Sequence, residues 1–256
     1  MKIVFTDIDG TLSLGKEVPS SAMRAIERFR AKGNLVFIAT GRNINYVRDN
    51  FSLYADGFIT NNGRLAYYKE NVIFDQPMDK EVVHEISDCL EKLHAGAAFH
   101  SKTKGYYVGP EDLKEVMAIT SDPGYLKDGL DENEDLYNFD ICFYDEKQKN
   151  EIKEALKDLC ILNPHGPHPS ADMTVKGCDK GDALKAVAKA LMVKIEDTYA
   201  FGDGRNDICM LKAAGHGIAM GNALRETKQA AEFVTKDIDK DGLYWGFVHY
   251  GLIEEE

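Results

Sequence analysis

Two aspartates, one residue apart, follow a short apolar run at the start of the chain. Asp7 and Asp9 lie in the stretch MKIVFTDIDGTL, directly after residues 2–6. On an extended segment, side chains at i and i+2 point the same way, so these two carboxylates would repel each other at neutral pH. Gly10 then allows the chain to turn and a ligand to approach closely. The pair alone is weak evidence, because two solvated loop acids would give the same letters.

Further polar clusters follow other predicted strands or begin a predicted helix. They are Thr40, Gly41 and Arg42; Lys180; and Asp203, Asn206 and Asp207. Each alone also reads as a turn or a surface residue, but in a doubly wound sheet all of them would meet at the carboxyl ends of the strands, where ligands bind. So many acids at one edge favour a hard cation such as Mg²⁺, which takes one or two carboxylates together with water and phosphate oxygens.

Nucleotide-binding loops are poorly supported by the sequence. Gly202 and Gly204 form half of a dinucleotide-binding fingerprint, but Asp207 stands where its third glycine would be. The chain also contains no GxxxxGK[ST] motif.

Short apolar runs alternate with helical patterns at both ends of the chain. The predicted strands are 2–6, 34–39, 57–60, 197–203, 216–220 and 232–235. The predicted helices are 20–33, 182–193, 207–214 and 223–231. Strand–helix–strand order with short links indicates a parallel sheet, and unbroken apolar strands indicate burial on both faces. We therefore expect an α/β fold in which both ends of the chain form one doubly wound sheet.

The middle of the chain has a mixed order of elements. It reads as a hairpin at 64–74, helices at 79–95 and 146–160, strands at 97–100, 106–108 and 138–145, and a surface loop at 120–135. This order predicts an α+β insert over about 78–178 within the α/β domain.

Composition excludes several classes of protein. The 256 residues carry a net charge of −12 and no block of basic residues, so neither nucleic acid nor an anionic membrane is an expected partner. The five cysteines form no CxxC pair, which argues against structural zinc and a disulfide framework. With no signal peptide and no apolar run near the ~20 residues of a membrane span, a cytoplasmic protein is expected. The oligomeric state is not specified, and a monomer is compatible with these features.

Four motifs resemble those of haloacid dehalogenase-type phosphatases. They are DIDGT (7–11), ATGR (39–42), DKG (179–181) and GDGRND (202–207). Their order, and the insertion between the second and third, resemble the Cof-type subfamily, as do residues 61–68, 217–223 and 239–247. The resemblance implies a Rossmann-like, mostly parallel catalytic core at 1–77 and 179–256, and an α+β cap domain at 78–178.

The resemblance also implies roles for single residues. Asp7 would be the nucleophile that forms an aspartyl-phosphate, and Asp9 the general acid and then the base. Mg²⁺ would be held by Asp7, the Asp9 backbone carbonyl and Asp203. A neighbouring anion and partial burial would raise the pKa of Asp9. Because true haloacid dehalogenases lack the second aspartate, Asp9 favours phosphoryl transfer.

The remaining motif residues would serve the transferred phosphate. Thr40, the Gly41 amide, Lys180 and Asn206 would bind its non-bridging oxygens. Asp207 would orient either metal-bound water or Lys180. Arg42 and Arg205 follow the motif cores and are expected to be surface residues.

The implied activity is a Mg²⁺-dependent phosphatase for small phosphorylated metabolites. Sugar phosphates are the substrate class expected first, and pyridoxal phosphate and nucleoside monophosphates are the alternatives. A phosphomutase that passes the phosphoryl group to a second sugar hydroxyl is the first alternative. A non-enzymatic module that binds a sugar phosphate is the second.

One polar segment of the insert stands apart from these motifs. HGPHPSADM (165–173) contains His165, His168 and Asp172. We expect a polar cap loop here in preference to a substrate-contacting edge. The two histidines are a poor metal pair, because the prolines at 164, 167 and 169 exclude the helix that would align them.

Overall fold

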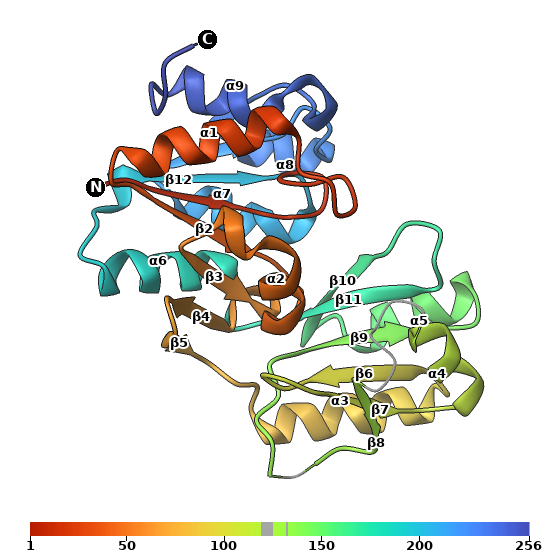
Figure 1. Ribbon diagram of the computed structural model, residues 1–256. Helices are drawn as coiled ribbons and strands as arrows, with labels where there is room; N and C mark the ends of the chain where they lie inside the picture. The colour runs from red at the N-terminus through yellow and green to blue at the C-terminus, as the bar shows by residue number, and fades with distance from the viewer. Residues whose placement is uncertain (119–124, 132, 256) are drawn as a thin grey trace. The chain divides into compact units, whose positions relative to one another are not determined.

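The computed structural model describes residues 1–118, 125–131 and 133–255. The chain divides into two compact units (Figure 1). The core unit comprises Met1–Asp75 and Asp179–Glu256, and the inserted unit comprises Gln76–Cys178. The sequence prediction placed these borders at residues 78 and 178.

An eight-stranded sheet forms the centre of the core unit, in the order β14-β13-β12-β1-β2-β3-β4-β5. Its strands are β1 (Ile3–Thr6), β2 (Leu35–Ala39), β3 (Gly57–Thr60), β4 (Leu65–Tyr68), β5 (Asn71–Asp75), β12 (Thr198–Gly202), β13 (His216–Ala219) and β14 (Phe233–Val234). The strands from β14 to β3 are parallel, and β4 and β5 continue the sheet as an antiparallel hairpin. The predicted doubly wound α/β fold is confirmed.

Helices cover this sheet because its strands are apolar on both sides. They are α1 (Ser20–Ala31), α2 (Ile44–Phe51), α6 (Lys180–Ala190), α7 (Ile208–Ala213), α8 (Arg225–Ala230) and α9 (Gly242–His249). In α1, Ala22, Ile26 and Phe29 are buried at helical spacing. Phe29 meets Phe247 of α9 edge to face, with 5.3 Å between the ring centroids. This contact fixes the last helix against the first.

The register of three parallel strands brings the motif residues together. Thr6 at the end of β1 lies opposite Ile38 of β2 and Phe201 of β12. Asp7 follows at once, and its backbone N–H donates to the Phe201 carbonyl at 3.0 Å. Thr40 and Asp203 come directly after the last residues of β2 and β12. Strand β1 is also where the chain order reverses, the usual position of a ligand site in such sheets.

The inserted unit contains a six-stranded sheet in the order β10-β11-β9-β6-β7-β8. Its elements are α3 (Lys80–Lys92), β6 (Gly96–His100), β7 (Gly105–Val108), α4 (Glu111–Ala118), β8 (Leu126–Asp128), β9 (Asn138–Cys142), α5 (Glu146–Ala155), β10 (Cys160–Pro164) and β11 (Ser170–Val175). On one face, Ile86 of α3 and Ile152 of α5 join Phe99 and Phe139 in a single apolar core. On the other face, Leu113 and residues near it cover only a small cluster.

Several sequence predictions of single elements are wrong. Residues 170–173 lie in β11 and not in a loop, and the predicted helix at 146–160 ends at Ala155 because the chain then enters β10. The expected loop at 120–135 includes β8, while residues 119–124 and 132 lie outside the described residues. Helices α2, α4 and α9 were not predicted. Helix α9 was missed because GLYWGFVH is apolar nearly all round and shows no helical period.

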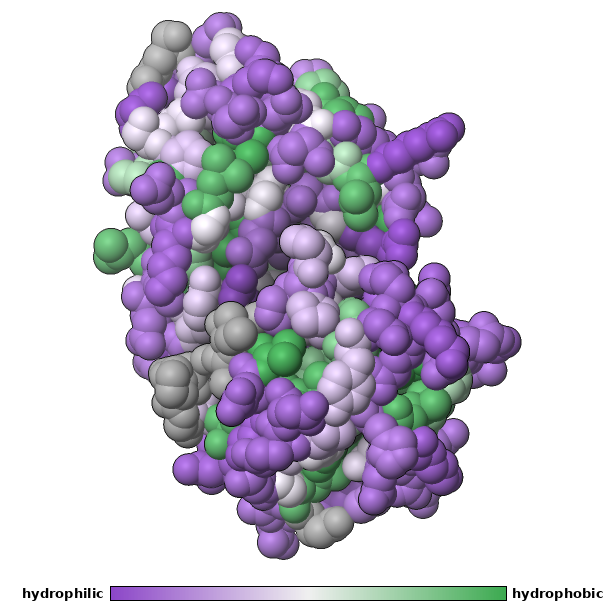
Figure 2. Space-filling view, turned by 90° about the vertical axis from the view of Figure 1, so that its right-hand side faces the viewer, coloured by the Kyte–Doolittle hydropathy of each residue, from purple (hydrophilic) through white to green (hydrophobic). Residues whose placement is uncertain are grey.

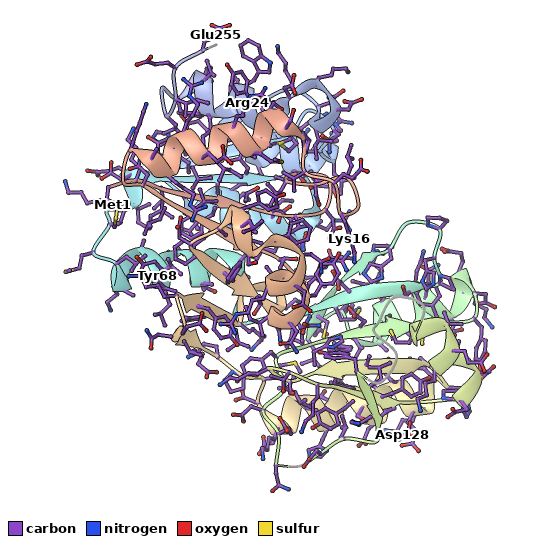
Figure 3. The ribbon with its side chains drawn as sticks, viewed as in Figure 1. Met1, Lys16, Arg24, Tyr68, Asp128 and Glu255 are labelled. Carbon is purple, nitrogen blue, oxygen red and sulfur yellow. The ribbon has the colours of Figure 1, made fainter. Side chains whose placement is uncertain are left out.

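The surface carries mainly polar side chains. Figure 2 shows mostly hydrophilic residues on the visible face, in keeping with the net charge of −12. In Figure 3, Arg24 projects from α1 and Asp128 from β8, and both residues are exposed. Within the described ranges, no helix combines the length and apolar character that crossing a bilayer requires.

Gly63 allows the loop after β3 to pack directly on the start of α6. Its φ of +100° is left-handed, and a Cβ there would lie 2.1 Å from the Asp179 carbonyl carbon and 2.3 Å from the Lys180 nitrogen. Because these neighbours are backbone atoms, Gly63→Ala should lower the free energy of unfolding, measured in urea, by about 2–4 kcal/mol. Gly33 is the matched control, since it has φ +79° and open space around it. Equal losses for Gly63→Ala and Gly33→Ala would contradict this prediction.

Candidate active site

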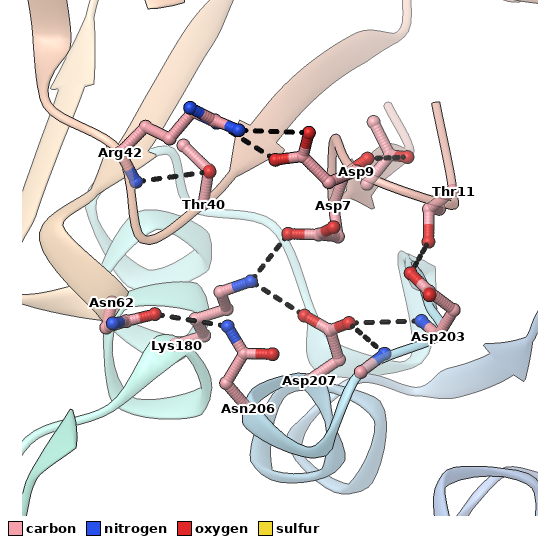
Figure 4. Close-up of polar contacts among 12 residues, drawn as sticks. Asp7, Asp9, Thr11, Thr40, Arg42, Asn62, Lys180, Asp203, Asn206 and Asp207 are labelled. Carbon is pink, nitrogen blue, oxygen red and sulfur yellow. Dashed lines mark hydrogen bonds and ion pairs between the residues drawn. The ribbon is translucent and has the colours of Figure 1, made fainter. Parts of the chain in front are cut away.

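A buried lysine lies between two carboxylates at the carboxyl end of β1 (Figure 4). Lys180 Nζ donates to Asp7 Oδ1 and to Asp207 Oδ1, each at 2.7 Å. Only 1% of Lys180 is exposed. Lys180 is the first residue of α6, and the preceding Asp179 caps that helix through the Gly181 and Asp182 amides. The lysine is therefore fixed at both ends, by the helix cap and by its two ion pairs.

Burial sets the electrostatics of this group. It raises the pKa of Asp7 well above its usual range; Lys180 opposes the shift, and the Asp207 and Asp203 carboxylates add to it. Burial alone would lower the pKa of Lys180, but the Asp207 and Asp7 carboxylates hold it above its ordinary value. The lysine is therefore charged, and one positive charge does not compensate the acids around it.

Asp203 and Asp207 are oriented by hydrogen bonds from the chain around them. Asp203 Oδ1 accepts from the Thr11 hydroxyl at 2.8 Å. Asp207 Oδ2 accepts from the Asp203 and Gly204 amides at 3.0 and 2.9 Å. Burial, reinforced by the Asp207 charge, raises the pKa of Asp203 to about 6 although Thr11 opposes the shift. The loop after β12 thus aims two acids at the end of β1.

These acids can hold a divalent cation. Carboxylate oxygens of Asp7, Asp203 and Asp207 all lie within 4.8 Å of one another. Oxygen ligands of this kind suit Mg²⁺, and neighbouring carboxylates add to the rise in pKa that burial causes at Asp7 and Asp203. Both carboxylate oxygens of Asp207 accept hydrogen bonds, Oδ1 from Lys180 and Oδ2 from two amides, whereas the bonds to Asp7 and Asp203 are made to Oδ1, so Asp7 and Asp203 are the better ligands. The residues present therefore fit a magnesium ion.

Asp9 points elsewhere, which the sequence did not predict. The chain is not extended here but turns at Ile8, whose carbonyl accepts from the amides of residues 11, 12 and 13. The Asp9 carboxylate accepts from Arg42 Nε at 2.9 Å and from its terminal nitrogen at 3.2 Å. Its side chain is 49% exposed, so the expected partial burial is wrong.

Arg42 contacts the site, contrary to the expectation of a surface residue. Its guanidinium pairs with Asp9 and lies 4.3 Å from the centroid of the Tyr46 ring. The arginine is therefore held from two sides. Arg205 is exposed and pairs with Glu226, as a surface residue would.

The predicted phosphate-binding residues lie around the same strand ends. Thr40 is buried, and its hydroxyl accepts from the Arg42 amide at 3.2 Å. Gly41 follows it in the turn after β2. Asn206 Nδ2 donates to Asn62 Oδ1 at 3.2 Å.

Sequence reasoning assigned no role to two residues that support the site, Thr11 and Asn62. Thr11 was part of DIDGT, but its partner Asp203 is distant in the sequence. Asn62 has a left-handed φ of +53°, for which the Asn-Asn-Gly run was an available signal. Its Nδ2 is buried and has no hydrogen-bond partner among the described residues. A donor in this position can serve a bound anion.

Comparison with known proteins decides the family. The family model for haloacid dehalogenase-like hydrolases matches residues 4–247. The chain belongs to this family. The putative phosphatase YkrA of Bacillus subtilis is 30% identical, with 99% of each chain covered. The 5-amino-6-(5-phospho-D-ribitylamino)uracil phosphatase YwtE of the same organism is 29% identical, with 95% of this chain and 96% of that protein covered.

Solved structures of phosphatases from this family are also similar to this chain. The subclass IIB sugar phosphatase BT4131 is 31% identical, with a TM-score of 0.82 over 99% of this chain and 100% of that one. BT1666 from Bacteroides thetaiotaomicron is 27% identical, with a TM-score of 0.83 over 99% of this chain and 96% of that one. The resemblance to Cof-type phosphatases is confirmed, and the chain is a hydrolase that acts on phosphate esters.

The raised pKa of Asp203 makes stability depend on pH in the metal-free protein. The group binds protons more strongly in the folded state, so its contribution to stability is present below about pH 4 and is lost as the pH rises to about 6. At neutral pH in EDTA, Asp203→Asn should raise the free energy of unfolding by about 1–3 kcal/mol, because it removes the buried charge and keeps an oxygen for Thr11.

Urea unfolding at neutral pH and at about pH 4 measures this effect. The gain should disappear at the lower pH, and Mg²⁺ should stabilise the wild-type protein but not the variant. A variant that is less stable than wild type at neutral pH would contradict the prediction.

Proposed function

We propose that this phosphatase is Mg²⁺-dependent, acts on phosphate monoesters of small polyhydroxy metabolites, and forms an aspartyl-phosphate at Asp7. The observation that carries the proposal is the buried Asp7 carboxylate at the end of β1, held 2.7 Å from Lys180 beside Asp203. A carboxylate fixed in this way has little freedom to lose when it attacks an ester.

The first step would transfer the phosphoryl group to Asp7. A carboxylate oxygen of Asp7 forms a bond to phosphorus while the bond from phosphorus to the ester oxygen breaks. Thr40, the Gly41 amide, Lys180 and Asn206 would bind the non-bridging oxygens, where charge accumulates. Asp207 would position Lys180, to which it is bonded at 2.7 Å.

Asp9 would carry the proton in both steps. It protonates the departing alkoxide, and then takes a proton from the water that attacks phosphorus and releases Asp7 and inorganic phosphate. The Arg42 pair holds the Asp9 carboxylate toward solvent. Since that pair is exposed, it is weak enough to break when a substrate arrives.

Magnesium would be bound by Asp7, Asp203 and the Asp9 backbone carbonyl. When bound, it neutralises repulsion between Asp7 and the phosphate dianion and polarises the phosphoryl group. The clustering of Asp7, Asp203 and Asp207 oxygens within 4.8 Å of one another supports this assignment.

The names of two relatives point to the substrate class. One is described as a sugar phosphatase and the other acts on a phospho-D-ribityl compound. Both descriptions contain a phosphate ester of a polyhydroxylated carbon chain, so we extend that class to this protein. The phosphomutase alternative has no observation in its favour, and the cytoplasmic location and monomeric state stay predictions.

Phosphate release over a panel of metabolites tests the proposal. We expect turnover of sugar and polyol phosphates with Mg²⁺, at least about 10-fold above pyridoxal phosphate and nucleoside monophosphates, and loss of turnover in EDTA. Asp7→Asn should reduce turnover by about 10⁴-fold or more, with an unchanged circular dichroism spectrum. Near-native activity of this variant would refute the nucleophile assignment, and a requirement for a sugar bisphosphate would favour a mutase.

Asp9→Asn separates the two chemical steps. With an aryl phosphate, whose leaving group needs little protonation, the variant should still phosphorylate Asp7 but hydrolyse the product about 10²–10⁴-fold more slowly. Rapid-quench measurements should then show a burst of aryl alcohol equal to the enzyme, and intact-mass spectrometry should show one added phosphoryl group. If phosphorylation and hydrolysis slow equally, Asp9 is not the base.

A further inference from the structure

A second polar cluster lies within the inserted unit, on the face of its sheet opposite the main apolar core. Asp140 of β9 and Asp172 of β11 are direct partners in an antiparallel ladder, so their side chains share one face. His100 of β6 joins them, because its Nε2 lies 2.9 Å from Asp140 Oδ2. Three neighbouring strands thus contribute to one cluster.

The carboxylates of Asp140 and Asp172 repel each other when both are charged. Like charges directly opposite each other on a sheet are destabilising. Asp140 Oδ1 is buried and has no hydrogen-bond partner among the residues described. One oxygen of this carboxylate is therefore available to a ligand.

His165 completes the group from the turn that follows β10. Its Nδ1 lies 2.8 Å from the Ser170 hydroxyl, which orients the ring. Its Nε2 lies 3.6 Å from Asp172 Oδ1, beyond ordinary hydrogen-bond distance. Two ligands bound about 2.1 Å from one tetrahedral zinc ion lie about 3.4 Å apart, so this spacing suits a shared ion.

We propose that Asp140, Asp172 and His165 form a binding site for a divalent transition metal, with zinc as the best fit. One ligand atom from each residue lies within 4.8 Å of the other two. His100 would orient Asp140 from behind, and Ser170 would orient His165, as outer partners do at metal sites. The site needs neither the core unit nor phosphatase activity.

The donor set selects the class of ion. An imidazole nitrogen with two carboxylates suits Zn²⁺ or its neighbours in the first transition row, whereas Mg²⁺ prefers oxygen ligands alone. His165 and His168 do not form a metal pair: the Nδ1 atom of each lies 2.8 Å from the Ser170 hydroxyl. The partners of His165 are instead aspartates on strands, which sequence spacing does not reveal. A bound ion would tie the turn between β10 and β11 to β9.

The test uses the full-length Asp203→Asn protein, which lacks one of the three carboxylates of the core-unit cluster. After EDTA treatment it is titrated with Zn²⁺ against a chelating indicator, with Mg²⁺ in excess. We expect one zinc ion per chain and a higher thermal midpoint with zinc. On this background, His165→Gln and Asp172→Asn should each weaken binding by about 100-fold or more, and Ser170→Ala by about 10-fold. His84→Gln, which removes an exposed histidine of the same unit, should change it less than about twofold.

X-ray absorption at the zinc edge identifies the atoms bound to zinc in the protein that keeps Asp140, Asp172 and His165. One imidazole nitrogen with oxygen ligands is expected. A zinc ion without imidazole, no zinc binding to the parent protein, or equal affinity of the His165→Gln and His84→Gln proteins would overturn the proposal.

Discussion

A buried ammonium group lies between two carboxylates at the centre of the candidate active site. Taking three charges out of water is unfavourable, and such groups rarely improve stability over apolar side chains. Under the proposed mechanism, the Lys180 contacts with Asp7 and Asp207 hold the attacking carboxylate beside an ammonium group before any substrate binds. The three residues come from separate segments: Asp7 follows β1, Lys180 begins α6, and Asp207 lies in the loop after β12.

The sheet provides that placement. Parallel strands in register deliver Asp7, Thr40 and Asp203 to one edge, and the reversal of chain order at β1 leaves room there. Glycine is needed at position 10, where two segments of the site come into contact. A Cβ at Gly10 would lie 2.5 Å from Asp203 Oδ2, so the turn after Asp9 and the loop after β12 meet without space for a side chain.

The sequence predicted those parts of the site that depend on strand ends. Asp7, Thr40 and Asp203 follow the ends of neighbouring parallel strands as predicted, and Lys180 reaches Asp7 from the start of α6, while their chemical roles stay predictions. The Asp9–Arg42 pair was not predicted, since it follows from a turn at Ile8 that the DIDGT letters do not distinguish from an extended segment. Asp140 and Asp172 were not paired either, because antiparallel register between distant strands is a tertiary property. Helix α9 was missed for a local reason, its lack of a polar face.

The junction between Cys178 and Asp179 has a mechanical consequence. Asp179 is the first residue of the returning core segment, and the lysine is its immediate neighbour. The Asp179 carboxylate clamps the first turn of α6 through the Gly181 and Asp182 amides, while Asp182 returns a bond to the Asp179 amide. This reciprocal cap fixes the backbone on the amino-terminal side of Lys180 at the residue where the chain returns to the core unit.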